Sequence, residues 1–275
     1  MNVLMPASLP EALNQLASDA TAVPMAGGTD LLVHWPVRVE AHERTYVDLS
    51  RLDSLKPLHW TEDELMLGGL TTYWDVILDA RARAELPLLV DAARQVGAIQ
   101  IQARGTWAGN IVNASPAADG VPVLMAYDAI VVLESLGARE EVPLQRFYLG
   151  YKEMRRRSDQ LVVAIRIPRR PYAYSVFEKV GSRRAQAIAK LGLAVTQSEA
   201  GWRVVAASMA PTIRRCPAIE RLLEEGAPVR VPDDLLPAID RDVLPIDDIR
   251  STAHYRRQVM ARLLYDDLRE RCGWP

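Results

Sequence analysis

The sequence predicts an α+β fold, and three observations support this prediction. Hydrophobic residues make up 49% and charged residues 25% of the 275 residues, a composition typical of globular proteins rather than of disordered or membrane proteins. Short apolar runs of strand length alternate with segments in which apolar residues have helical spacing. A proline-bounded segment, Pro168-Arg169-Arg170-Pro171, separates the first 170 residues from a final part of strands and helices, so we expect a boundary there, with domains at 1–170 and 171–275.

The N-terminal part, residues 1 to about 55, is expected to form a small α/β unit. Ser8 and Glu11 form a capping box, because a serine N-cap and a glutamate three residues later satisfy free N–H groups at a helix start. This helix should end near Ser18. The segments expected after it are a buried strand over residues 22–25, a short helix or turn over 31–33 and a strand over 45–49.

The central part, residues 56–170, should mix strands and helices. Glu62 and Asp63 mark the turn of a hairpin, and Thr72 can cap a helix that runs through Leu78. The other expected segments are the hairpin strands over 58–60 and 64–67, helices over 86–96 and 121–127, strands over 129–133 and 160–167, and a strand-like stretch interrupted by glycines over 105–110.

The C-terminal part should consist of a sheet followed by helices. Tyr255, Val259 and Leu263 have helical spacing near the end of the chain. The expected segments are strands over 172–180, 188–197 and 202–209 and helices over 217–225 and 252–270.

Charge and cysteine content exclude several classes of protein. The 33 Lys and Arg residues nearly balance the 35 Asp and Glu residues, which gives a net charge of −2 and no basic field for nucleic acid. Cys216 and Cys272 are too few and too far apart for a disulfide scaffold, a zinc ribbon or an iron–sulfur cluster in this chain. The first residues lack the features of a signal peptide and no apolar run is long enough to span a membrane, so we expect a cytoplasmic protein.

Common catalytic motifs are also missing. The chain has no GxGxxG after a strand, no GxxxxGK[ST] and no GxSxG, so Rossmann, Walker and α/β-hydrolase sites are not predicted. The four histidines are scattered without metal-ligand spacing, and we expect no metal site. No pair of residues suggests acid–base catalysis, so no catalytic residue is assigned.

Two glycine-containing loops remain as candidates for a binding site. The first is Ala26-Gly27-Gly28-Thr29-Asp30, which directly follows a predicted strand. Adjacent glycines permit positive φ angles, and successive N–H groups in such a turn bind anions such as phosphate. Asp30 does not suit phosphate, because its carboxylate would repel it, and suits a helix cap or a ribose or ribityl hydroxyl better.

The second loop, residues 105–110, continues into Ala114-Ser115-Pro116-Ala117-Ala118-Asp119. Its small residues would let a cofactor approach the backbone, and Asn110 could bridge polar atoms. Either loop alone could equally be a tight turn.

Together the loops resemble a known family. AGGTDLL at residues 26–32 and GTWAGNIVNASPAAD at 105–119 are similar to the FAD-binding subunit of the molybdenum hydroxylases, the xanthine dehydrogenase and carbon monoxide dehydrogenase family. Further similar segments follow in the family's order over the rest of the chain: Gly150-Tyr151-Lys152 with 161–168, Phe177-Glu178-Lys179, Ser182-Arg183-Arg184 with Ile188-Ala189-Lys190, and Tyr255-Arg256.

The resemblance implies a two-subdomain FAD-binding fold of the PCMH, vanillyl-alcohol-oxidase-like type, followed by a C-terminal three-stranded antiparallel sheet with helices. Both glycine loops would hold the FAD diphosphate. Asp119 would hydrogen-bond polar groups of FAD, Val162 would pack near the adenine or flavin, and Lys179 would reach the flavin headgroup and tune its potential. The implied cofactor-binding residues are Pro24, Met25, Ala26, Gly27, Gly28, Thr29, Asp30, Leu31, Ile101, Gly105, Thr106, Gly109, Asn110, Asp119, Val162 and Lys179.

Each of these single residues also has a structural interpretation. Asp119 could be a helix cap, Val162 a core residue of a strand and Lys179 a solvated strand residue. The sequence also departs from the family pattern: Trp107 and Ala108 replace isoleucine and glycine, and Ala187 replaces aspartate. A Cβ at residue 108 requires an ordinary φ angle there.

The implied function is that of an electron-transfer subunit. Large and small partner subunits would carry molybdopterin and two [2Fe–2S] clusters, and electrons would pass through FAD in this chain to NAD or a quinone. Two alternatives stay open: a stand-alone flavin-dependent oxidoreductase of the same broad fold, and a flavin-free binding or assembly module. Flavin content distinguishes the flavin-free module from the other two functions. Dependence on partner subunits distinguishes the stand-alone oxidoreductase from the electron-transfer subunit.

Overall fold

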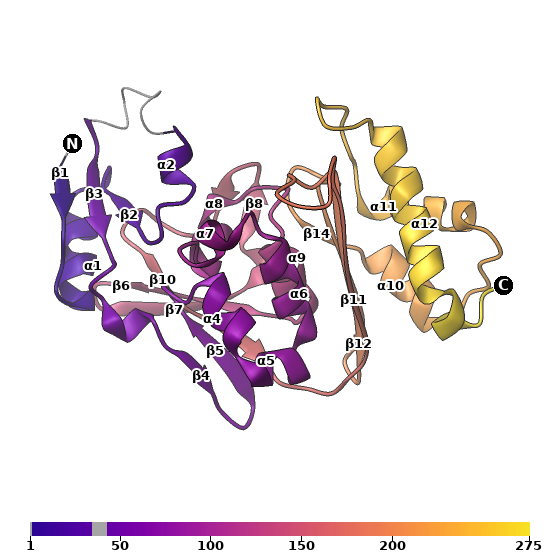
Figure 1. The fold of residues 1–275 in the computed structure, drawn as a ribbon, viewed down its shortest axis with the longest axis horizontal. Helices are drawn as coiled ribbons and strands as arrows, with labels where there is room; N and C mark the ends of the chain where they lie inside the picture. Colours follow the sequence, from indigo (N-terminus) through magenta and orange to yellow (C-terminus); the bar gives the residue numbers. More distant parts are fainter. Residues whose placement is uncertain (1, 35–42) are drawn as a thin grey trace.

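The computed structural model describes residues 2–34 and 43–275, which form three parts side by side (Figure 1). A three-stranded sheet lies at one end, a five-stranded sheet with helices in the middle, and a four-stranded sheet with the C-terminal helices at the other end. The α+β fold class is thereby confirmed.

The N-terminal sheet is parallel and has the order β1-β3-β2. Ser8 caps helix α1 as expected: its Oγ accepts from the N–H of Glu11 at 3.3 Å, and Glu11 Oε2 accepts from the N–H of Ala7 at 2.7 Å. The elements here are β1 (Asn2–Leu4), α1 (Leu9–Ser18), β2 (Val23–Met25), α2 (Leu31–His34), β3 (Thr45–Asp48) and the 3₁₀ turn η1 (Asp53–Leu55). The first glycine loop therefore runs from the end of β2 to the start of α2.

The central sheet is antiparallel, with the order β4-β5-β10-β6-β7. Its strands are β4 (Leu58–Trp60), β5 (Glu64–Gly68), β6 (Ile130–Ser135), β7 (Ala138–Pro143) and β10 (Leu161–Pro168). The helices packed with it are α4 (Tyr73–Leu78), α5 (Ala80–Glu85), α6 (Pro87–Gln95), α7 (Ile99–Gln102), α8 (Trp107–Asn113) and α9 (Gly120–Ala126). A 3₁₀ turn η2 (Leu144–Arg146) and a small hairpin, β8 (Tyr148–Gly150) with β9 (Glu153–Met154), precede β10.

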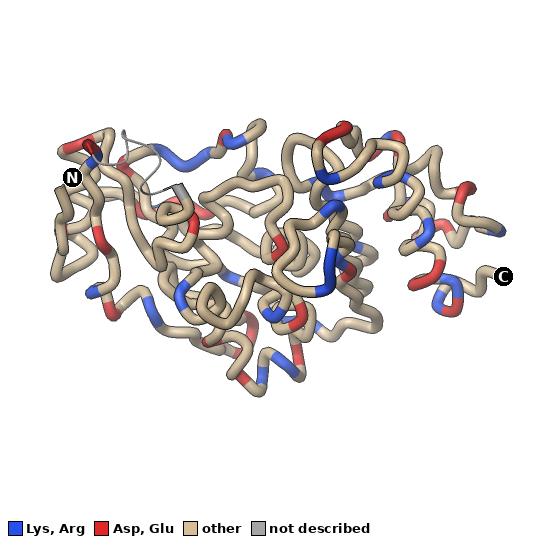
Figure 2. Tube along the Cα trace, turned by 45° about the horizontal axis from the view of Figure 1, so that its top comes forward, with Lys and Arg blue, Asp and Glu red and all other residues tan. Residues whose placement is uncertain are grey.

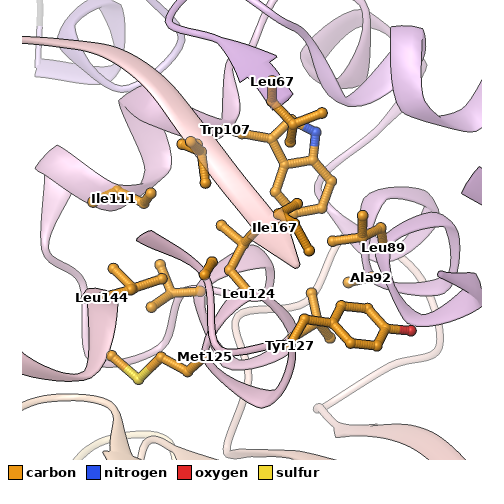
Figure 3. Packing of buried hydrophobic residues seen from close by; sticks show 14 of the residues in the cluster. Leu67, Leu89, Ala92, Trp107, Ile111, Leu124, Met125, Tyr127, Leu144 and Ile167 are labelled. Carbon is orange, nitrogen blue, oxygen red and sulfur yellow. The ribbon is translucent and has the colours of Figure 1, made fainter. Parts of the chain in front are cut away.

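The strand expected over residues 105–110 is wrong, because this stretch enters helix α8. Thr106 caps the helix, and its Oγ1 accepts from the N–H of Gly109 at 3.0 Å. Trp107 and Ile111 lie four residues apart and are both fully buried, so packing stabilises a helix that Gly109 alone would disfavour. Figure 3 shows both side chains in the core with Leu124, Tyr127 and Ile167, other members of the same cluster.

The C-terminal sheet is antiparallel and carries helices on both faces. Helices α6 and α9 contact it from the central part, and α10 and α12 contact it on the other side (Figure 1). Its strands are β11 (Tyr172–Val180), β12 (Leu191–Ser198), β13 (Gly201–Ala207) and a short fourth strand, β14 (Arg214–Arg215), beyond the three expected. The remaining elements are α10 (Pro217–Glu224), η3 (Pro232–Leu235), α11 (Leu236–Asp242) and α12 (Ala253–Cys272).

One hydrophobic cluster joins the central part to the C-terminal sheet. Phe177 on β11 and Val205 on β13 belong to the same buried cluster as Trp107 and Tyr127. The hydroxyl of Thr196 also donates to the carbonyl of Ala126 at 2.9 Å across this junction. The sheet is therefore held against α9, which fixes the position of β11 and of Lys179 on it.

Acidic and basic residues are interleaved along the molecule (Figure 2). Within the described ranges, no helix is long and apolar enough to cross a bilayer.

Candidate functional site

The first glycine loop presents free backbone donors. Within the described part of the chain, the N–H groups of Gly27, Gly28 and Thr29 donate no hydrogen bond. Gly28 has a φ of +70°, a conformation that suits glycine and turns successive N–H groups toward one point. Three adjacent free donors are available to bind an anion.

The two glycine loops meet through Gly27. A Cβ placed on Gly27 would lie 1.8 Å from the carbonyl oxygen of Arg104, so only glycine permits this approach. Arg104 Nε also donates to the carbonyl of Gly27 at 3.4 Å. Thr29 Oγ1 lies 3.3 Å from where a Cβ on Gly105 would be, so the hydroxyl of the first loop faces the second loop.

Backbone hydrogen bonds hold the second loop to the segment around the start of α4. The N–H of Tyr73 donates to the carbonyl of Gly105 at 3.2 Å, and the N–H of Trp107 donates to the carbonyl of Thr71 at 3.2 Å. Both bonds are backbone bonds, so the loop has a fixed path before any ligand binds. Ala108 lies in helix α8 with an ordinary φ angle, which satisfies the condition that its Cβ imposes.

Asn110 supplies a polar atom that has no partner. Its Oδ1 is buried and accepts no hydrogen bond from the described residues. A Cβ on Gly120 would lie 2.9 Å from this oxygen, so the start of α9 packs directly beside it. An unsatisfied buried amide oxygen is costly, and such atoms in native proteins commonly bind a ligand or water.

Asp119 and Lys179 form a buried ion pair between the central part and the C-terminal sheet. Lys179 Nζ donates to Asp119 Oδ2 at 2.6 Å and to the carbonyl of Gln95 at 2.8 Å. The Lys179 side chain is only 6% exposed and the Asp119 side chain 13%, so Lys179 is not a solvated strand residue. Asp119 occupies the N-cap position of α9, but its side chain makes no capping bond.

Burial controls the charge of this pair. Removal from water raises the pKa of Asp119 to about 6, although the ammonium of Lys179 opposes the rise. Burial also raises the pKa values of Tyr73 and Tyr148 well above their ordinary range. Both phenols therefore stay protonated, and Tyr148 donates to the carbonyl of Ile111 at 3.0 Å. Burial therefore moves the pKa of the Asp119 carboxyl toward neutral pH.

The structure brings most of the predicted site residues into one region. The contacts connect the first loop to the second, Asn110 to the start of α9, and Asp119 to Lys179. Five further predicted residues lie in the elements around this region. Pro24 and Met25 pair with β3, and Leu31 begins α2. The carbonyl of Ile101 on α7 accepts from the N–H of Gly105, and Val162 is a core residue of β10. Val162 belongs to the same buried cluster as Trp107 and Ala108 of the second loop.

Several residues at this site were not predicted. Asn113 donates to Asp30 and accepts from Lys152, and the carbonyl of Gln95 accepts from Lys179. Asn113 and Lys152 lie inside the two segments that resemble the family, so their positions could have singled them out. The carbonyl of Gln95 has no sequence signal, because every residue has one.

Comparisons with known proteins agree with this geometry. The family model described as the FAD binding domain in molybdopterin dehydrogenase matches residues 1–170, and the model of the CO dehydrogenase flavoprotein C-terminal domain matches residues 175–270.

Curated relatives match over most of their length. The nicotinate dehydrogenase FAD-subunit of Eubacterium barkeri is 30% identical over 85% of this chain and 82% of its own. The carbon monoxide dehydrogenase medium chain of Hydrogenophaga pseudoflava is 29% identical over 92% and 89%, respectively.

The fold matches solved structures as well. A carbon monoxide dehydrogenase structure from Hydrogenophaga pseudoflava, which lacks the Mo-pyranopterin moiety of its cofactor, aligns with a TM-score of 0.86 at 26% identity, covering 98% of this chain and 96% of that one. A reconstituted CO dehydrogenase from Oligotropha carboxidovorans shares the fold with a TM-score of 0.89. This chain therefore belongs to the FAD-binding medium subunits of the molybdenum hydroxylases, the xanthine dehydrogenase and carbon monoxide dehydrogenase family, and is an oxidoreductase subunit.

Proposed function

We propose that this chain binds one FAD across its two glycine loops and passes electrons from partner [2Fe–2S] clusters through it to an external acceptor. The observation that carries the proposal is the group of three free N–H donors at Gly27, Gly28 and Thr29, held against the second loop. A diphosphate is the part of FAD that such donors would bind.

The residues present fit FAD. Asn110 Oδ1 is a buried acceptor without a partner and can receive a hydrogen bond from a cofactor hydroxyl or N–H group. Residues 24–31 would line the first loop around the diphosphate, and Ile101, Gly105, Thr106, Gly109 and Asn110 would form the second. Asp119 and Val162 would lie against the cofactor, and the Lys179 ammonium would face its flavin end. A bound flavin supplies a centre that takes electrons singly and releases one or two.

The protein's own residues would set the electrostatics of that centre. Lys179 is buried, so its positive charge is screened less than a surface charge would be. Asp119 holds the ammonium in one position and partly balances it. The pair would thereby stabilise negative charge on a reduced cofactor by a limited amount.

The chemistry of the substrate would take place on partner chains. We infer a large subunit with molybdopterin, a small subunit with two [2Fe–2S] clusters, and NAD or a quinone as the acceptor. The names of the relatives, such as medium chain and FAD-subunit, support a multi-subunit assembly. We also infer a cytoplasmic location and a domain boundary near residue 170, which the ends of the two family matches support.

The proposal is tested by purifying the tagged chain from its native host without denaturant and measuring its FAD, molybdenum and iron. We expect all three to co-purify with this chain in constant ratio through size exclusion. FAD without molybdenum or iron would instead support a stand-alone flavoprotein. Absence of FAD, molybdenum and iron from the purified chain would support a flavin-free binding module.

A further inference from the structure

Three side chains form a polar bridge beside the first glycine loop. Asn113, in the last turn of α8, donates through Nδ2 to Asp30 Oδ1 at 2.9 Å. Lys152, in the turn between β8 and β9, donates to Asn113 Oδ1 at 2.8 Å and to the Asn113 carbonyl at 2.5 Å. The bridge thus joins three segments that lie far apart in the sequence.

The chemistry of the bridge allows one orientation of Asn113. An ammonium can only donate and a carboxylate can only accept, so Asn113 must turn its oxygen to Lys152 and its NH₂ to Asp30. An amide is the side-chain group that can do both at once at this size. The carbonyl of Asn113 lies at the C-terminal end of α8, where the helix dipole is negative, and the positive charge of Lys152 is favourable there.

Lys152 adopts a backbone conformation that lysine seldom takes. Its φ is +60°, in the left-handed region, which costs free energy for a residue with a Cβ. Lys152 lies in the turn of the β8–β9 hairpin, and its Nζ makes two further bonds to Asn113.

We propose that Asn113 and Lys152 are positioning residues for the anion-binding loop: through Asp30 they fix the loop against α8 and draw its carboxylate away from the free N–H donors. This inference rests on the proposed FAD function. Without the bridge, the Asp30 carboxylate, two residues after Gly28, would be free to turn toward the three donors. It would then compete with the cofactor diphosphate for them.

An exchange of the two side chains tests this role. N113D sets two carboxylates against each other, and we expect the dissociation constant for FAD to rise about five- to tenfold. The double variant D30N/N113D again places an amide donor against a carboxylate, with the polarity reversed, and Lys152 still has an acceptor. We expect it to recover most of the FAD affinity that N113D loses.

Thermal melting of the FAD-free chain separates positioning from stability. N14D is the matched control, because Asn14 is an exposed residue of α1 and the substitution adds the same charge. We expect the FAD-free N113D and N14D proteins to melt at the same temperature within about 2 °C.

Three results would overturn the inference: FAD binding by N113D equal to wild type, no recovery in the double variant, or a much lower melting temperature of FAD-free N113D than of N14D. A wild-type chain that binds no FAD would overturn the proposed function itself, and this inference with it.

Discussion

Gly27 is the residue on which the distance between the two loops depends most directly. Its α-carbon lies so close to the Arg104 carbonyl that a single added carbon would overlap with it. Because the opposing atom belongs to the backbone, the clash cannot be relieved by a change of rotamer. The loops must move apart, and the donors of the first loop then no longer face the second.

We therefore predict that G27A loses at least about tenfold in FAD affinity, since a displacement of the loop costs several hydrogen bonds to the diphosphate. The chain should stay folded by circular dichroism. G137A is the control, because it also adds a Cβ to a glycine, yet nothing lies within 4 Å of that Cβ. Isothermal titration with FAD measures both. Equal affinity in G27A and G137A would show that the contact of the loops is not part of the binding site.

Lys179 is the residue expected to tune the bound cofactor. We predict that K179M retains FAD with a reduction potential lower by about 30 mV, or about 1.4 kcal/mol for a two-electron couple. The cause is the loss of a buried positive charge that favours the reduced form. A spectroelectrochemical titration at pH 8 measures the potential.

Two further variants check that explanation. D119N in the K179M background should recover part of the loss, because it removes the negative charge left behind. K56M, at an exposed lysine paired with Asp53, should leave the potential unchanged. A wild-type potential in K179M would mean that this ammonium lies too far from the flavin to influence it.

At the scale of elements, helix α12 carries a charge that opposes the fold. Asp267 faces Glu178 on β11 and has Asp266 beside it, and its Oδ2 is buried without a partner among the described residues. Burial and these two neighbouring carboxylates raise the pKa of Asp267 from 3.8 to about 6. Ionisation therefore costs the folded state more than the unfolded one.

The sign of the pH dependence follows from that raised pKa. Between pH 3.8 and about 6 the unfolded chain loses its proton from Asp267 first, so the fold loses stability as pH rises and stays at the lower level above pH 6. D267N removes this cost. We predict that it unfolds in urea with about 1 kcal/mol more stability than wild type at pH 7.5, a figure reduced for the half-exposed position. The advantage should vanish near pH 4, and a constant difference at both pH values would contradict the assignment.

The elements that the sequence predicted are those with local signals. The cap at Ser8 and the capping box at Thr72 begin helices where expected, although the Glu11 side chain bonds to the N–H of Ala7 rather than of Ser8. The apolar runs of β10 and β11 form strands. Helix α8 was missed because Gly105 and Gly109 mask its helical pattern, while burial of Trp107 and Ile111 depends on the rest of the core. Local patterns do not carry that information.

The residues of the site also divide into those with a local sequence signal and those without one. The glycine loops were candidates because of their residue types, and the family resemblance implied that Asn110 and Asp119 belong to the same site. The Asp119–Lys179 pair could not be predicted, since 60 residues separate its members and only the docked sheet brings them together. The bridge through Asn113 likewise depends on three segments that meet only in the folded chain.

At the scale of the whole molecule, one hydrophobic cluster and a charged contact join the two parts that meet near residue 170, while a second cluster lies within the C-terminal part. Asp128 follows α9 and binds Arg203 of β13 at 2.9 Å and Arg170 at 3.3 Å. Asp128 has a φ of +54°, which asparagine tolerates as well as aspartate. D128N thus removes charge with little change of backbone.

We predict that wild type and D128N each unfold in one cooperative transition, because the shared core couples both parts. D128N should be less stable by about 1–2 kcal/mol, since two charge-assisted hydrogen bonds are weakened. Tryptophan fluorescence and far-UV circular dichroism in guanidinium check this. Separate transitions by the two probes in wild type would show that the parts fold independently.

The central claim is that the two loops together form an FAD site, and the stoichiometry of bound flavin tests it most directly. The chain is purified, titrated with FAD under native conditions and freed of excess ligand, and the retained cofactor is identified by absorbance and mass. We expect one FAD per chain. A chain that keeps its fold and retains no flavin at saturating FAD would contradict it.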